Sequence, residues 1–191
     1  MNIEKGQPGY IKSKKRKSLL FASMEFAIVI ILLVTGYVTT GSKKNIFTVI
    51  AILGCLPAAK MLVGYIVMIP YKSIASSMEN EICEKAPYIT KVFDLIITNK
   101  DKIMPVDALV ITQTTICGYT SNKKTDTNRV SKDIKGILLE HKIEVGTVKV
   151  FHEFKPFITR AEGLNAMKSV AQTDTSDIER EMKQTIMTIA M

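Results

Sequence analysis

Two long apolar runs near the start of the chain constrain its fold more than any other feature. The first covers residues 19–38 and the second residues 46–69, and a short polar link, residues 39–45, joins them. At about 1.5 Å per residue, roughly 20 helical residues cross the hydrocarbon core of a bilayer. Backbone groups in lipid must bond within their own segment, so each run is predicted to be a helix. The short link predicts that the two membrane-spanning helices form an antiparallel hairpin.

The rest of the chain is long enough for one small folded domain. The chain has 191 residues, and the hairpin with its flank uses about the first 70. The remainder can bury a single core. We therefore predict a basic cytoplasmic tail, a two-helix transmembrane hairpin, a cytoplasmic α/β domain and a C-terminal amphipathic helix, covering residues 1–18, 19–70, 71–172 and 173–191 respectively.

The positive charge of the chain is concentrated beside the membrane. The formal net charge is +8, but residues 1–18 alone carry six Lys or Arg against one Glu. Residues 72–191 carry seventeen Lys or Arg against sixteen Asp or Glu, which leaves the domain almost neutral. A protein that binds nucleic acid needs a concentrated basic face. The lipid bilayer is thus the predicted partner of the basic residues, and nucleic acid is not a predicted partner.

The basic cluster also predicts the orientation of the hairpin. Lys- and Arg-rich flanks stay on the cytoplasmic side, and the cluster before the first run outweighs Lys43 and Lys44 in the link. Both termini and the domain are therefore predicted to be cytoplasmic. The same cluster can also attract anionic lipid, because each basic residue near the membrane surface contributes about 1 kcal/mol to binding. The cluster consists of Lys12, Lys14, Lys15, Arg16 and Lys17.

Two ionisable residues fall inside the apolar runs. A charge at the bilayer centre costs about 2.5–3.5 kcal/mol, so Glu25 and Lys60 each need a compensating interaction. In an antiparallel hairpin they lie at similar depths, so we predict an ion pair that fixes the register of the two helices. The alternative roles are a proton or ion relay, or a docking point for a partner helix.

The domain shows a regular order of helix and strand patterns. Helical spacing covers residues 72–86, β-rich runs follow, and a later helix ends near His141. A last amphipathic helix begins where Ser176 and Glu179 have the spacing of a capping box. Its apolar stripe predicts docking on protein, either in cis or across a dimer. We predict a mixed sheet of about four strands covered by helices, with strands at residues 88–98, 106–112, 115–120 and 147–151.

The two central strands carry a resemblance to a known family. An Asp, Asp107, stands near the start of the apolar run 106–111, and the run 115–120 follows after a tight turn. Residues 72–151 resemble the nuclease-related (NERD-type) restriction-endonuclease-like domains. The resemblance implies that Asp107 is a catalytic ligand of Mg²⁺ and that an acid-x-Lys motif on the third strand completes the metal site. That strand has Gly118, Tyr119 and Thr120 instead, so the motif is incomplete.

These observations leave two classes of function. The first is a membrane-anchored α/β interaction module without catalysis, which holds a protein partner or forms a homo-oligomer. The alternative is a membrane-tethered, metal-dependent nuclease or hydrolase that uses residues such as Asp94, Asp107 and Glu79. No cofactor is predicted. No metal site is predicted either, because the cysteines lack the spacing of metal ligands.

Overall fold

A computed structural model describes residues 3–41, 46–99, 102–170 and 175–190. The chain divides into two compact units. The first consists of residues 1–10 together with residues 73–191, and the second of residues 11–72. Lys43 and Lys44 of the link, and residues 100–101, lie outside the described residues.

The second unit is a pair of long helices, as predicted. Helix α1 covers Tyr10–Thr40 and helix α2 covers Ile46–Met68. Both are long and apolar enough to cross a membrane, with mean hydropathies of 2.4 and 2.2 over their most apolar windows. Because α1 begins at Tyr10, the basic cluster forms the first turns of this helix and is not part of an unstructured flank.

Two contacts hold α1 and α2 antiparallel. A Cβ atom added at Gly54 would lie 3.3 Å from Cγ2 of Val29, so the two backbones approach closely at this level. Near the other end, the Lys15 ammonium donates to the carbonyl of Ile69 at 2.9 Å and also to the carbonyl of Tyr71. Lys15 thus satisfies carbonyls just beyond the end of α2, a position where a cation also interacts favourably with the helix dipole.

The first unit is the predicted α/β domain with a four-stranded mixed sheet. The sheet has the order β1-β2-β3-β4, in which β1, β2 and β3 are antiparallel and β4 runs parallel to β3. The parallel pair requires a crossover, which α4 supplies. In chain order the elements are α3 (Ser76–Lys85), β1 (Thr90–Asn99), β2 (Lys102–Ile111), β3 (Thr115–Tyr119), α4 (Thr127–Glu140), β4 (Thr147–Phe151), α5 (Phe154–Val170) and α6 (Ser176–Ile189).

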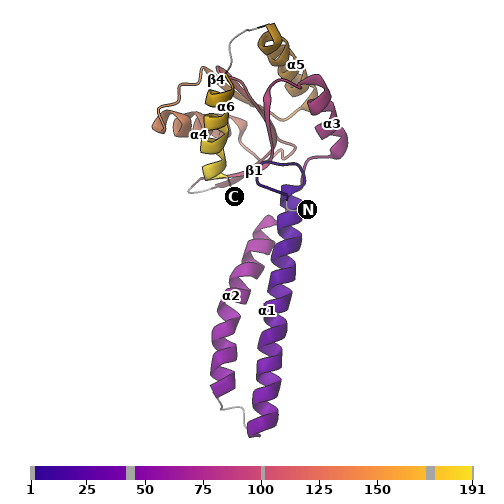
Figure 1. The fold of residues 1–191 in the computed structure, drawn as a ribbon, viewed down its shortest axis with the longest axis vertical. Helices are drawn as coiled ribbons and strands as arrows, with labels where there is room; N and C mark the ends of the chain where they lie inside the picture. The colour runs from indigo at the N-terminus through magenta and orange to yellow at the C-terminus, as the bar shows by residue number, and fades with distance from the viewer. Residues whose placement is uncertain (1–2, 42–45, 100–101, 171–174, 191) are drawn as a thin grey trace. The chain divides into compact units, whose positions relative to one another are not determined.

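Helices cover both faces of the sheet (Figure 1). An apolar core lies between the sheet and the helices on each face. Helices α4 and α6 lie on one face, where Ile134 and Ile186 are completely buried. Helices α3 and α5 lie on the other, around the buried ring of Phe157. The C-terminal helix therefore docks on the sheet of its own chain. Ile178, which belongs to the apolar stripe of α6 in the sequence, is 40% exposed.

The segment before α1 packs on the domain, which differs from the predicted solvated tail. The carbonyl of Gly6 accepts a hydrogen bond from the backbone N–H of Phe93 in β1 at 2.9 Å. The Lys5 ammonium donates to the carbonyl of Met187 near the end of α6 at 2.6 Å. The outer edge of β1 would otherwise expose unpaired backbone groups, and this segment covers part of that edge. The two-helix hairpin is therefore an insertion within the chain of the domain.

Gly6 should be sensitive to any side chain. Its φ is +85°, and a Cβ atom there would lie 2.9 Å from Sδ of Met187 and 3.0 Å from Cγ1 of Val92. We expect Gly6→Ala to lower the free energy of unfolding of the domain by about 1–2 kcal/mol from backbone strain, with the contacts adding to this loss. Urea denaturation of the intact protein in a mild detergent measures the effect.

A matched control is Gly163→Ala in α5, where nothing lies within 4 Å of the added atom. That change should raise stability by up to about 1 kcal/mol, because alanine favours the helix. Equal effects of the two substitutions would contradict the packing of the N-terminal segment on the domain.

Candidate functional site

Two buried carboxylates stand opposite each other where β1 and β2 are locally distorted. Phe93 pairs with Ala108 and Leu95 pairs with Val106, so Asp94 and Asp107 fall between these pairs. Asp94 has a φ of +54° and is 1% exposed, and Asp107 is 6% exposed. A residue in the left-handed region breaks the alternation of a strand. The register of β1 and β2 thus brings together two of the residues that the sequence indicated as candidate ligands.

Each carboxylate holds a neighbouring segment of backbone. Asp94 Oδ1 accepts from the N–H of Ile74, before α3, at 2.9 Å. Asp107 Oδ2 accepts from the N–H of Ser121, after β3, at 2.5 Å. Burial raises the pKa of Asp107 above its ordinary value, and the nearby charge of Asp94 raises this pKa further, while the hydrogen bonds from Ser121 oppose both effects. The pair therefore anchors the segments that enter and leave the sheet.

The structure does not assemble a larger ligand set around this pair. Within the described ranges, no group of three or more His, Cys, Asp or Glu side chains is placed to hold a metal ion, so Glu79 does not join the two aspartates. Thr120 directly follows β3, next to Tyr119, which pairs with Ala108. It is completely buried and donates to the carbonyl of Pro105 at 2.8 Å.

Asp107→Asn should raise the stability of the domain at neutral pH. An amide oxygen still accepts from Ser121, while the cost of a buried charge disappears. Because the folded-state pKa of this carboxyl is raised, the wild-type protein loses stability as the pH rises from the unfolded pKa through the folded pKa. The advantage of the variant should therefore shrink toward about pH 4, near the unfolded pKa. Urea denaturation at both pH values measures this difference, with the exposed Glu153→Gln as control. A less stable variant at pH 7 would contradict this account.

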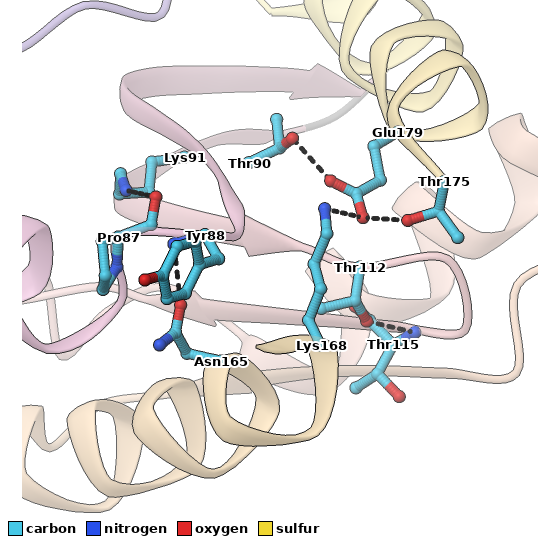
Figure 2. Close-up of polar contacts among 10 residues, drawn as sticks. All are labelled: Pro87, Tyr88, Thr90, Lys91, Thr112, Thr115, Asn165, Lys168, Thr175 and Glu179. Atoms are coloured by element: carbon cyan, nitrogen blue, oxygen red, sulfur yellow. Dashed lines mark hydrogen bonds and ion pairs between the residues drawn. The ribbon is translucent and has the colours of Figure 1, made fainter. Parts of the chain in front are cut away.

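A third buried carboxylate forms the centre of a separate polar network, shown in Figure 2. Glu179 of α6 is 0% exposed. Its Oε1 accepts from the Lys168 ammonium at 2.5 Å and from the Thr175 hydroxyl at 2.8 Å. Its Oε2 accepts from the hydroxyl of Thr90 in β1 at 2.7 Å. The carboxylate thus links the start of α6 to the end of α5 and to the sheet. The predicted capping box of Ser176 and Glu179 is wrong, because the N-cap residue is Thr175 and its side chain makes no capping hydrogen bond.

A pocket of about 170 Å³ opens beside this network. Apolar side chains from α5 form one wall, and the polar ion pair lies beside them. Met167, which lines the pocket, is 64% exposed, and Val170 on the next turn of α5 is 81% exposed. Sequence reasoning missed this site, although the apolar pair at the end of an amphipathic helix was a signal. The lining residues are Thr112, Gln113, Thr114, Leu164, Met167, Lys168, Thr175 and Glu179.

In the hairpin, the structure does not bring Glu25 and Lys60 together. The contact of Gly54 with Val29 places Glu25 near Ala58, four residues along each antiparallel helix. Lys60 is two residues further on, a rotation of about 200° around the helix axis, and its side chain is exposed. Oε2 of Glu25 is buried without a hydrogen-bond partner in the described part of the chain. Glu25 and Lys60 therefore lie at similar depths in the hairpin but do not contact each other.

Comparison with known proteins gives no relative for this fold and these sites. The sequence matches no protein-family model. No curated protein and no solved structure is significantly similar to the chain.

Proposed function

We propose that the chain is a membrane-anchored interaction module, in which the hairpin holds the α/β domain at the cytoplasmic face and the domain binds a protein partner. The length and hydropathy of α1 and α2 support the anchor. The basic residues at the start of α1 support the cytoplasmic orientation. The contact of Gly6 with Phe93 supports it further, because it keeps the residues before the first span on the side of the domain.

The observation that carries the proposed partner binding is the pocket beside α5. Exposed apolar side chains next to a pocket with fixed polar groups are typical of protein recognition sites. Met167 and Val170 provide the apolar surface, while the hydroxyl of Thr175 and the ammonium of Lys168 are already fixed by Glu179. By contrast, Asp107 is engaged in holding the backbone at Ser121.

Site-specific photo-crosslinking tests this function. A photoreactive amino acid replaces Met167 in the intact protein in its native membrane, and a second variant carries it at Leu139 of α4, which is 51% exposed and lies on the other face of the sheet. We expect a discrete adduct from position 167, none from position 139, and loss of the first adduct when Val170→Glu is added. Equal adducts from both positions, or none from either, would contradict a binding site at this pocket.

The alternative, a membrane-tethered metal-dependent nuclease or hydrolase, is favoured by one specific observation. Asp107 lies on the second strand of a mixed sheet whose elements follow the order expected from the resemblance to nuclease-related domains, and Asp94 is its neighbour. Two carboxylates could hold one divalent cation. Titration of the intact protein with Mn²⁺ distinguishes the two functions. Saturable binding that Asp107→Asn abolishes supports the alternative, whereas its absence supports the interaction module.

A further inference from the structure

The outward face of α2 carries one charged side chain, Lys60, at a depth where an isolated charge is unfavourable. Lys60 is exposed and lies on the side of α2 that faces away from α1. It stands eight residues before the end of the helix at Met68. The corresponding depth of about 12 Å lies close to the middle of a hydrocarbon core about 30 Å thick. An ammonium at this depth is energetically unfavourable unless a second group compensates its charge.

The same face allows another helix to approach closely. Gly64 follows Lys60 by one helical turn, and a Cβ atom at Gly64 would meet nothing within 4 Å. Four residues correspond to about 400°, so Gly64 lies within about 40° of Lys60 around the helix axis. Small residues on the surface of a membrane helix let a second backbone come near, which brings polar side chains of the two helices into contact.

We propose that this face of α2, centred on Lys60 and Gly64, binds a membrane-spanning helix of another protein that carries an Asp or Glu at the depth of Lys60. The inference rests on the proposed membrane anchor. A carboxylate in the partner neutralises the ammonium, and the open surface at Gly64 allows the two side chains to meet. Charge complementarity therefore defines the chemistry of the partner.

Two other occupants fit this face less well. A second copy related by a two-fold axis along the membrane normal would place Lys60 against Lys60 at the same depth, which is repulsive. Its own acidic residue, Glu25, lies on the face of α1 that packs against α2, with Oε2 buried. A lipid phosphate compensates lysines near helix ends, where the side chain reaches the interface, whereas Lys60 lies near the middle of the core.

Energy transfer in vesicles tests the proposal. The full-length chain with a donor dye is reconstituted in phosphatidylcholine vesicles with acceptor-labelled host peptides, each a 20-residue leucine helix with either Glu or Leu at its centre. We expect the protein to bind the Glu peptide about tenfold more strongly than the Leu peptide, since a polar contact between membrane helices contributes about 1–2 kcal/mol. Lys60→Leu should remove this preference.

Two further variants distinguish the role of the Lys60 charge from the role of the open surface at Gly64. Gly64→Leu keeps the ammonium but blocks close approach, so it should weaken binding of the Glu peptide. Ile66 lies about 120° from Lys60 and about 160° from Gly64 around the helix axis, so Ile66→Leu should leave binding unchanged. An unchanged preference in Lys60→Leu, or no preference in the wild-type protein, would overturn the proposal. Self-association of the wild-type chain that Lys60→Leu removes would assign the face to a second copy. If alkaline carbonate extracts the chain from the vesicles, the membrane anchor itself is contradicted.

Discussion

Glu179→Ala is expected to lower the free energy of unfolding of the domain by about 3 kcal/mol. The carboxylate is completely buried and accepts hydrogen bonds from Lys168, Thr175 and Thr90. Its removal leaves a partly buried ammonium without its counter-charge and removes the link between α6, α5 and the sheet. The expected loss is at the lower end of the range for broken buried pairs, because the Lys168 side chain is 23% exposed and regains some hydration.

Pulse proteolysis of the intact protein in a urea series measures this loss. The matched control is Glu181→Ala, an exposed acidic residue on the same helix, which should change stability by less than about 0.5 kcal/mol. If Glu179→Ala were as mild as the control, the network around Glu179 would not hold α6 in place.

Ile186→Ala should cause a loss of similar size by a different mechanism. Ile186 is completely buried in the core shared by α4, α6 and the sheet. Replacing a buried isoleucine by alanine removes apolar contacts and leaves a cavity, at a cost of about 2–5 kcal/mol. Ile178→Ala is the control, because Ile178 lies on the same helix and is 40% exposed.

Pulse proteolysis of Ile186→Ala at several protein concentrations distinguishes docking of α6 in cis from docking across a dimer. Because α6 packs on its own sheet, the loss caused by Ile186→Ala should not depend on protein concentration. A loss that varies with concentration, or an equal effect of Ile178→Ala, would contradict this packing.

The periodic parts of the fold could be predicted from the sequence because they depend on local pattern. Two apolar runs of sufficient length predicted the hairpin, and β-rich runs bounded by turns predicted the sheet. The strand at residues 147–151 has the predicted bounds. The crossover through α4 led to the predicted mixed sheet, since a parallel pair cannot be closed by a short turn.

Contacts between distant segments could not be predicted in the same way. Gly6 binds β1 through its carbonyl group, which every residue carries, so no side-chain pattern indicated the contact. The similar depths of Glu25 and Lys60 gave no rotation angle, and the rotation of α2 turns Lys60 away from α1. Glu179 has the spacing of a capping residue, but Lys168 and Thr90 draw its carboxylate into the domain.

We propose that the membrane hairpin is inserted into a domain that stays on the cytoplasmic side. Labelling of single cysteines with a membrane-impermeant maleimide tests it most directly, in a background where Cys55, Cys83 and Cys117 are replaced. We expect Ser42→Cys, in the link between the spans, to react in intact cells, and the exposed Ser176→Cys to react only after permeabilisation. Reaction of Ser176→Cys in intact cells, with Ser42→Cys protected until permeabilisation, would contradict the orientation and with it the account.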